Sequence, residues 1–489
     1  MTSPERMTSQ ERMTSPERIS DLAVIGAGPA GLAGAITAAD GGCRVIVLDL
    51  GQRPGGQYWR HPPASLGGGP TPFHHGWRTF APLLRRFEAH QRAGRIDYLP
   101  ETAVWRLERD DLLTVRAMTG ERRPEACTVR ARTALVATGA FDRQVPFRGW
   151  TLPGVMAVGG AQSLLKNSGV APGRRVVVAG TGPFLLSAAE GLLRAGAEVA
   201  AVVEANPPAV YARGLRTVAA VPEKLAEAAG YALALARHRV PYLVGRAVVE
   251  AHGAQRLDGV TIRRVRGDWT THGAARRIAC DTLAVGFGFV PQLELLLQSG
   301  CETRVDRSGT LVAVVDGRQQ TRVTDVYAAG EPTGVGGAEL ALAEGTLAGD
   351  AIATRLGHGA PLDASARQAA VRRRSRLRAF AELLAAAHPV PPGWRTWCDE
   401  ATVVCRCEEV TIAQVAEAVA LGAEDPRALK LLARPGMGWC QGRICGAAVA
   451  TLTGELGGRA PGEPELTSLA RRSFAHPVPL EVLADQTSP

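Results

Sequence analysis

The feature that most constrains the fold of this chain is a glycine-rich turn, Gly26-Ala-Gly-Pro-Ala-Gly31, between an apolar strand and an apolar helix. Leu22–Ile25 predicts the strand, and the apolar stretch after the turn predicts a helix that reaches Ala39. A second strand, Arg44–Leu48, follows and ends in Asp49. A strand, a glycine turn, a helix and a second strand ending in an acid predict a βαβ unit that binds a dinucleotide.

Each residue type in this unit has a physical role. Gly26 allows the tight turn, Gly28 lets the backbone approach a pyrophosphate, and Gly31 lets the helix pack closely on the strand. The helix N-terminus then faces the phosphates, and Asp49 is placed to accept a hydrogen bond from a ribose hydroxyl. A βαβ unit of the same pattern that holds no nucleotide is the alternative.

Three later segments fit one long cofactor that crosses one parallel sheet. Gly55-Gly56-Gln57 follows the second strand. Ala134–Gly139 predicts an apolar strand that ends in Thr-Gly, and residues 325–331 predict a strand that runs into Gly330-Glu331.

Together these segments resemble the two-dinucleotide-domain flavoproteins, the group of glutathione and thioredoxin reductases. The resemblance implies that the glycine turn holds the FAD pyrophosphate, that the Ala-Thr-Gly strand lies beside the cofactor, and that Glu331, where the family has Asp, meets the ribityl chain. Tyr58 stands where a redox-active Cys is expected, which argues against a disulfide reductase. We expect no catalytic residue of the chain's own. The expected FAD-binding residues are Gly26, Gly28, Pro29, Ala30, Gly31, Asp49, Gly56, Gln57, Val104, Ala137, Thr138, Gly139, Gly330 and Glu331.

A second βαβ start follows, with a strand at Arg175–Ala179, the turn Gly180-Thr-Gly182 and a second strand ending in Glu204. Glu204 favours NAD over NADP, because an acid accepts from a free ribose 2′-hydroxyl. The third glycine of the motif is replaced by Leu185. We therefore leave two interpretations open: Gly180, Gly182 and Glu204 bind a dinucleotide, or the domain folds in the usual way and holds none.

Four of the nine cysteines fall within residues 405–445, as Cys405-x-Cys407, 32 intervening residues and Cys440-x4-Cys445. Four thiolates can hold zinc or an iron–sulfur cluster. Neither half has the C-x2-C spacing of a zinc ribbon. Two short helices are predicted between the pairs, the first opened by the capping box Thr411/Gln414 and the second by Asp425-Pro426. The segment resembles the [2Fe-2S] domain of bacterioferritin-associated ferredoxin, which implies that the four cysteines bind the cluster.

Residues 357–398 differ from their surroundings. Asp363 predicts the cap of a helix rich in arginine between Arg372 and Arg378, and His388-Pro389 begins the break after it. We interpret the arginine run as a solvated helix face, with a docking surface for an acidic protein as the alternative.

Composition excludes several classes. Aromatic residues make up 5% of the chain, so the net charge of +9 does not argue for nucleic-acid binding.

The longest apolar stretch, Val176–Leu193, contains Gly180, Gly182 and Glu190, and so does not predict a membrane span. The first 18 residues repeat a polar hexapeptide, and no secretory leader is recognisable. Nine cysteines in a chain with no recognisable secretory leader suggest a reducing compartment, which favours a cytoplasmic protein.

At about 150 residues per domain, 489 residues predict about three domains. We predict an α/β fold with two Rossmann-like dinucleotide-binding domains, the second inserted in the first, and a small, mostly α-helical [2Fe-2S] domain. The predicted parts are a disordered repeat tail (1–18), an FAD-binding domain (19–148 and 282–356), a second dinucleotide domain (149–281), a helical linker (357–398), the [2Fe-2S] domain (399–460) and a C-terminal tail (461–489).

This order of parts resembles the A or α subunits of heteromeric opine and amino-acid dehydrogenases, among them those of octopine and nopaline oxidase, the hydrogen cyanide synthase B subunit and hydroxyproline dehydrogenase α subunits. The resemblance implies an electron-transfer subunit in a hetero-oligomer with an FAD-containing, glycine-oxidase-like β subunit and a small ferredoxin-like subunit. Some such relatives carry NAD or ATP, and an FMN between subunits. The alternatives are a self-sufficient NADH-dependent FAD/[2Fe-2S] reductase and a scaffold whose nucleotide is structural.

Overall fold

A computed structural model describes residues 18–62, 73, 74, 76–120, 123–458 and 462–487. The repeat tail expected at residues 1–18 lies almost wholly outside these residues. Within them, no helix has the length and apolar character needed to cross a membrane.

The first sheet is built around the strand before the glycine turn. Its strand order is β3-β2-β1-β6-β5-β4, and β19 pairs with the C-terminal part of β6. Strands β1, β2, β3, β6 and β19 run parallel, and β4 and β5 form an antiparallel edge. The strands span Arg18–Ile25 (β1), Val45–Leu48 (β2), Ile96–Leu99 (β3), Thr102–Arg109 (β4), Leu113–Thr119 (β5), Glu125–Val136 (β6) and Val326–Ala328 (β19).

Helices cover the first sheet. On one face lie α1 (Pro29–Asp40), α2 (Trp77–Arg92) and α9 (Gly337–Arg355). Helices α1 and α9 cross at very short range. A Cβ atom at Gly345 would lie 2.0 Å from the carbonyl oxygen of Ala30, so only glycine fits at this position. The apolar core of the other face includes α8 (Glu294–Gln298) and the hairpin β17 (Thr303–Val305)–β18 (Leu311–Ala313).

The second sheet is wholly parallel, with the order β11-β10-β9-β15-β8. Its strands span Val155–Ala157 (β8), Arg175–Gly180 (β9), Glu198–Glu204 (β10), Tyr242–Val244 (β11) and Thr282–Gly286 (β15). Its helices span Val158–Ser168 (α3), Phe184–Arg194 (α4), Ala209–Arg213 (α5), Leu215–Ala219 (α6) and Pro222–Arg237 (α7). A three-stranded antiparallel sheet, which we did not predict, adjoins it with strands Arg246–His252 (β12), Gly259–Val265 (β13) and Thr271–Ala279 (β14).

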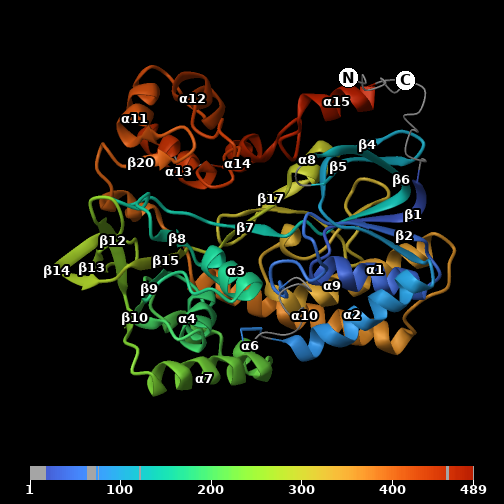
Figure 1. The fold of residues 1–489 in the computed structure, drawn as a ribbon, viewed down its shortest axis with the longest axis horizontal. Coiled ribbons are helices and arrows are strands. Elements are labelled where there is room, and N and C mark those ends of the chain that lie inside the picture. The colour runs from blue at the N-terminus through green and yellow to red at the C-terminus, as the bar shows by residue number, and fades with distance from the viewer. Residues whose placement is uncertain (1–17, 63–72, 75, 121–122, 459–461, 488–489) are drawn as a thin grey trace, which may run out of the picture.

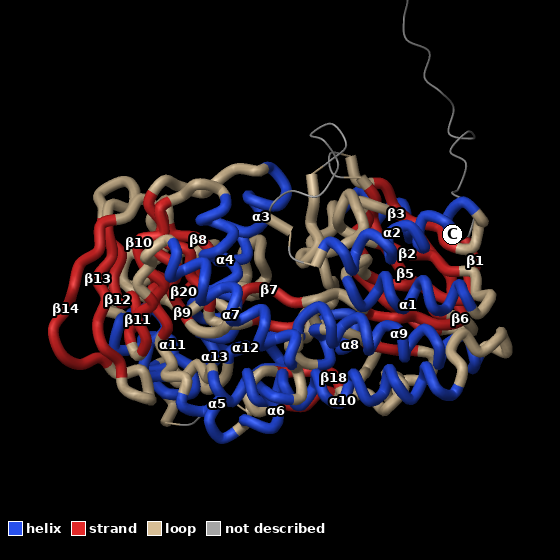
Figure 2. Tube along the Cα trace, turned by 90° about the horizontal axis from the view of Figure 1, so that it is seen from below, coloured by secondary structure: helices blue, strands red, loops and turns tan. Residues whose placement is uncertain are grey.

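Two chain crossings join the two parallel sheets. The outgoing strand β7 (Ala140–Asp142) pairs antiparallel with the returning strand β16 (Phe289–Pro291). Figure 2 shows β7 running between the two halves of the molecule. The predicted fold class, two dinucleotide-binding folds with the second inserted in the first, is confirmed.

After α9 the chain forms α10 (Ala364–Ala387), the 3-10 helix η3 (Pro392–Trp397) and a small domain of short elements. The predicted caps form: the Asp363 carboxylate accepts from the backbone N–H of Ala366 at 2.8 Å, and Thr411 and Gln414 make a capping box. The elements of the small domain span Val403–Cys405 (β20), Val410–Thr411 (β21), Ile412–Ala420 (α11), Pro426–Ala433 (α12), Gly446–Leu456 (α13) and Glu463–Ala470 (α14), and Leu480–Thr487 (α15) follows.

The arginines of α10 are only partly a solvated face. Arg376 pairs with Glu223 at the start of α7, at 3.0 Å, and Arg378 pairs with Glu344 on α9. Arg374 donates to the carbonyl oxygen of Gly317 at 2.8 Å. The interpretation of this run as solvated holds for Arg372, Arg373 and Arg376, which are exposed, but not for Arg374 and Arg378, which are half-buried against groups distant in sequence.

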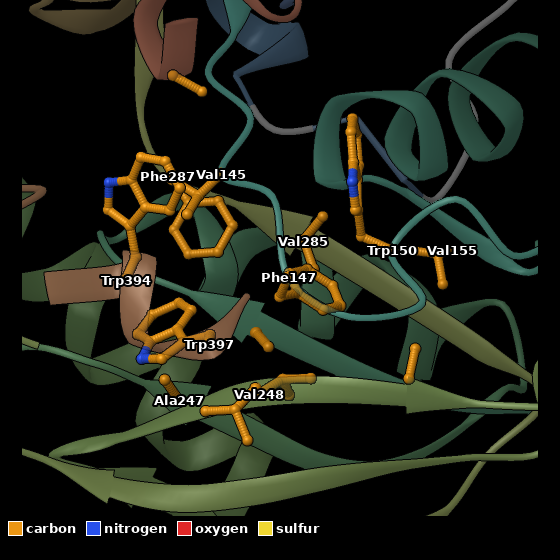
Figure 3. Close-up of a cluster of buried hydrophobic side chains, with 14 of the residues drawn as sticks. Val145, Phe147, Trp150, Val155, Ala247, Val248, Val285, Phe287, Trp394 and Trp397 are labelled. Carbon is orange, nitrogen blue, oxygen red and sulfur yellow. The ribbon is translucent and has the colours of Figure 1, made fainter. Parts of the chain in front are cut away.

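One apolar core joins the second dinucleotide fold, η3 and the small C-terminal domain. In Figure 3, Trp394 and Trp397 from η3 lie over the strands that carry Ala247, Val248 and Val285. The same cluster of buried residues includes side chains of the small domain, among them Val404, Cys445, Val449 and Leu452. The small domain is therefore packed against its neighbours rather than tethered loosely.

Candidate functional site

The first glycine turn has the geometry that its sequence predicts. Gly26 has φ +101°, and a Cβ atom at Gly31 would lie 1.8 Å from the carbonyl oxygen of Gly26, so no other residue fits there. Pro29 and Ala30 open helix α1 directly after Gly28. The helix N-terminus is thus free of long side chains at the point where a phosphate would approach.

Asp49 stands at the end of β2, beside this turn. Its Oδ1 accepts from the backbone N–H of Ala27 at 3.2 Å, and its Oδ2 accepts from the hydroxyl of Tyr98 at 3.3 Å. Burial raises the pKa of Asp49 above its ordinary value. The carboxylate is held next to the glycine turn by groups of its own domain.

The loop after β2 folds back onto the turn. Gly55 donates to the carbonyl oxygen of Ala27 at 2.8 Å, and Gly56 has φ +60°. A Cβ atom at Gly56 would lie 2.7 Å from the Cα of Gly28. Gln57 follows and is exposed.

A residue that sequence reasoning missed lies against this loop. The Lys166 ammonium on α3 donates to the carbonyl oxygen of Tyr58 at 3.0 Å and lies 5.4 Å from the centre of its ring. Burial lowers the pKa of Lys166 to about 8. A single lysine in a helix gave no sequence signal, since its contacts come from another domain.

The C-terminal ends of β1, β6 and β19 meet beside the glycine turn. Ala137 donates to the carbonyl oxygen of Ile25 at 2.9 Å, and the Thr138 hydroxyl donates to that of Gln292 at 2.9 Å. Gly139 has φ +77° and begins the crossing to the second domain. The Ala-Thr-Gly segment therefore lies between the first motif and the return strand.

Glu331 provides a test of whether FAD fits. Its Oε1 accepts from the backbone N–H of Gly337 at 3.0 Å, whereas its Oε2 is buried with no hydrogen-bond partner among the described residues. Burial raises the pKa of Glu331 to about 7. A buried carboxylate oxygen without a partner needs a donor, and a ribityl hydroxyl supplies one, so these residues fit FAD.

The segment around Glu331 is fixed by a second acid. The buried carboxylate of Glu344 accepts from the backbone N–H of Gly330 and from the hydroxyl of Thr333, both at 2.9 Å. Arg378 of α10 donates to the same carboxylate. This network sets where Glu331 points.

Val104 lies in the middle of β4, where it pairs with Ala117 of β5 and is buried in the core beneath the sheet. Its side chain therefore belongs to the same buried apolar cluster as Ile25 and Leu48.

The second glycine motif differs from the first. Glu204 stands at the end of β10, and its Oε2 accepts from the backbone N–H of Gly182 at 2.8 Å. Gly180 has φ +137° and Gly182 has φ +107°. Leu185, in place of the third glycine, is buried in the core between α4 and the sheet.

The four cysteines of the small domain come together. The Cys445 thiol shares hydrogen bonds with Cys405 and Cys440, which hold the pKa of those two below the ordinary value. Cys407 contacts Cys440 in turn, and is itself exposed. The backbone N–H of Gly436 donates to the Sγ of Cys405 at 3.4 Å.

The grouping of these thiols fits a two-iron cluster. In the described part of the chain, no three His, Cys, Asp or Glu side chains converge on one metal ion. A [2Fe-2S] cluster spreads four thiolates over two irons, and backbone N–H donors to sulfur are among the groups that set its potential. The four thiols supply the number and kind of ligands that such a cluster needs.

The cluster loop touches the crossing between the two dinucleotide folds. Arg443 lies between Cys440 and Cys445, and its guanidinium stands 5.4 Å from the ring centre of Phe141 on β7. It also pairs with the buried Glu294 at 2.9 Å, as does Arg472. Phe141 is two residues beyond Gly139, so the cluster loop and the Ala-Thr-Gly segment lie at the same crossing.

Two family models match the chain. The model described as pyridine nucleotide-disulphide oxidoreductase matches residues 20–345, and the model described as BFD-like [2Fe-2S] binding domain matches residues 403–454. FAD and a [2Fe-2S] cluster are the cofactors that these two domains support. The matches to these two family models confirm the predicted cofactors FAD and [2Fe-2S].

Among curated proteins, the chain is 33% identical to the opine oxidase A subunit of Agrobacterium tumefaciens, over 88% of this chain and 85% of that protein. It is 34% identical to hydrogen cyanide synthase subunit HcnB of Pseudomonas aeruginosa, over 86% of this chain and 90% of that protein. Among solved structures, L-proline dehydrogenase from P. horikoshii shares the fold, with a TM-score of 0.64 and 21% identity over 96% of this chain and 80% of that one. The chain therefore belongs to the pyridine nucleotide-disulphide oxidoreductase family, in the group of FAD oxidoreductases that includes the opine oxidase A and HcnB subunits and carries a BFD-like [2Fe-2S] domain.

Proposed function

We propose that this chain is the electron-transfer subunit of a heteromeric FAD-dependent dehydrogenase or oxidase that acts on an amino acid, an opine or another secondary amine. Its partner is an FAD-containing, glycine-oxidase-like β subunit that oxidises the amine, and a small ferredoxin-like subunit completes the assembly. The proposal is supported by the relatives, which are themselves named as subunits.

The observation that carries the proposal is the contact between Arg443 and Phe141. It joins the loop between two cluster cysteines to the crossing that begins at Gly139. Glu294, buried on α8, holds Arg443 in that place. A chain built for electron relay needs its two redox groups rigidly held, and a contact that fixes the cysteine loop on this crossing supports that role.

The roles proposed for the residues follow from their positions. Gly26, Gly28 and Gly31, with the N-terminus of α1 at Pro29-Ala30, hold the FAD pyrophosphate, and Asp49 accepts from the ribose. When bound, FAD accepts an electron pair and the cluster accepts single electrons, so together they divide a two-electron oxidation into one-electron steps. The remaining proposed FAD contacts are Gly56, Gln57, Val104, Ala137, Thr138, Gly139, Gly330 and Glu331, and the proposed cluster ligands are Cys405, Cys407, Cys440 and Cys445.

The electron balance is simple. Oxidation of a secondary amine to an imine in the partner releases two electrons and two protons. This chain takes the two electrons and delivers them to an external acceptor such as a quinone or a dye. No residue of the chain has to bind the amine.

The test is anaerobic mixing of the purified chain with proline, octopine or glycine. We expect no change in its visible spectrum when it is alone, and bleaching when the partner subunit is present. Robust oxidation of any of these amines by the chain alone would overturn the proposal. Mass measurement of the extracted nucleotide separates FAD from NAD or ATP.

A further inference from the structure

The second glycine motif is already engaged by groups of its own domain. The two oxygens of Glu204 accept from the backbone N–H groups of Gly182, at 2.8 Å, and Asn206, at 2.9 Å. Glu204 is 2% exposed. A nicotinamide dinucleotide needs this carboxylate for its adenosine ribose. Asp49 of the first motif is likewise buried and bonded within its own domain, so these contacts alone do not exclude a nucleotide.

The linker after α10 lies on the same motif. The Nδ1 of His388 is 3.0 Å from the Thr181 hydroxyl, in the middle of the glycine turn, and 3.6 Å from Glu204. The Nε2 of His388 is 2.7 Å from the hydroxyl of Tyr211. The carbonyl oxygen of Pro389 accepts from the side-chain amide of Asn206 at 2.8 Å. A segment about two hundred residues later in sequence thus covers the groups that would meet the ADP half of a dinucleotide.

Trp269 and Trp397 hold the linker at its C-terminal end, beyond Pro389. The indoles of Trp269 and Trp397 stack with centroids 5.5 Å apart, and the Trp397 N–H donates to the carbonyl oxygen of Trp269 at 3.1 Å. The Trp269 N–H donates to the side-chain oxygen of Asn206 at 3.0 Å. Gly393 packs so closely that a Cβ atom would lie 2.0 Å from the carbonyl oxygen of Asp268.

Asp49, the acid of the first motif, is hydrogen-bonded to groups that lie near it in its own domain. The Asp49 side chain accepts from Ala27 of the glycine turn and from Tyr98 of the neighbouring strand β3, both within its own domain. The two motifs therefore differ in one respect: the linker contacts the second motif at Thr181 and Glu204, whereas Asp49 bonds to residues of its own domain.

We propose that the second dinucleotide fold binds the chain's own linker, His388-Pro389, in place of the ADP half of a nicotinamide dinucleotide. By binding the linker, this fold also fixes the position of the [2Fe-2S] domain. This goes beyond the proposed function, because it concerns a different site and stands whichever amine is oxidised. It also means that electrons do not enter the chain from NADH at this motif.

The experiment is hydrogen exchange on the full, FAD-saturated chain, with and without NADH at about 1 mM, where even a weak ligand is half bound. We expect no NADH-dependent protection of residues 180–186. Saturable protection of those amides would overturn the proposal.

A variant tests whether these contacts hold the linker. His388→Ala removes the contacts to Thr181 and Tyr211, and at about 1 kcal/mol for each of the two lost hydrogen bonds the amides of Val390, Gly393 and Trp394 should exchange roughly thirtyfold faster. His238→Ala, at an exposed position at the end of α7, is the control and should leave them unchanged. Unaltered exchange in His388→Ala would show that these contacts do not hold the linker, and would equally overturn the proposal.

Discussion

The guanidinium of Arg443 lies 5.4 Å from the ring centre of Phe141, and this contact joins the cluster loop to the crossing between the two dinucleotide folds. Arg443 is 11% exposed along its side chain and shares the buried Glu294 with Arg472. These contacts anchor the [2Fe-2S] domain against the crossing that begins at Gly139.

Replacing Arg443 tests this link. Arg443→Met removes a charged hydrogen bond to Glu294, which retains Arg472, so we expect a loss of about 2 kcal/mol in the free energy of unfolding. We also expect slower bleaching of the cluster after a light pulse reduces the flavin. Denaturant unfolding and time-resolved absorbance measure the two effects.

Arg427→Gln is the matched control, because Arg427 is an exposed arginine of the same domain. It should change stability by no more than about 0.5 kcal/mol. If Arg443→Met and Arg427→Gln bleach at the same rate, the contact has no part in the relay.

The four proposed cluster cysteines can be distinguished experimentally from a packing cysteine. Cys405→Ser removes one of four thiolates, so we expect iron to fall well below the two atoms per chain of an intact cluster, with loss of the brown colour. Burial raises the pKa of Cys398 to about 12, and its thiol donates to the carbonyl oxygen of Pro146 at 3.3 Å. Cys398→Ser should therefore keep its iron, and equal iron loss in both variants would count against the assignment.

Glu344 should control how well FAD is retained. Glu344→Gln leaves Arg378 half-buried without its counter-charge, and breaking such a pair costs about 3 kcal/mol. The segment Gly330–Thr333 loosens with it, so we expect flavin to be lost during gel filtration. Arg372→Gln, at an exposed position of the same helix as Arg378, should retain flavin as well as the unaltered chain does.

Trp397 should anchor the C-terminal domain. It is 2% exposed, and truncation of such a side chain to Ala costs about 3–5 kcal/mol. Limited proteolysis of Trp397→Ala should release a C-terminal fragment. Trp439→Ala is the control, since Trp439 is 82% exposed, and its cleavage pattern should stay that of the unaltered chain.

Glu331 gives the flavin-free chain a pH dependence. Burial raises its pKa from 4.5 to about 7, so the folded state binds more protons than the unfolded state between these values. The free energy of unfolding should therefore fall as the pH rises from 4.5 to 7, by up to about 3 kcal/mol from this group. Urea unfolding across this range, compared with Glu331→Gln, isolates the effect, and parallel curves for the two proteins would refute it.

Local sequence signals predicted the elements of both glycine motifs closely. The first helix was expected to reach Ala39 and ends at Asp40. The strand expected at Arg175–Ala179 spans Arg175–Gly180, and the next strand ends at Glu204 as expected. The caps at Asp363, Thr411 and Asp425 formed as predicted, because capping depends on residues two or three apart.

What the sequence did not reveal depends on contacts between distant residues. The arginines of α10 looked solvated because their acids, Glu223 and Glu344, are far away in the chain. His388 looked like a helix breaker, and nothing near it indicates Thr181 or Tyr211 as partners. Trp269 and Trp397 likewise meet only through the tertiary fold.

The most direct test of the relay is the visible absorbance of the [2Fe-2S] cluster, recorded without air while proline, octopine or glycine is added. We predict that the cluster stays oxidised in the chain alone and is bleached when the co-expressed flavoprotein partner is present and oxidises its amine. An amine that bleaches the isolated chain, or a complex that turns over its amine while the cluster stays oxidised, would contradict the account.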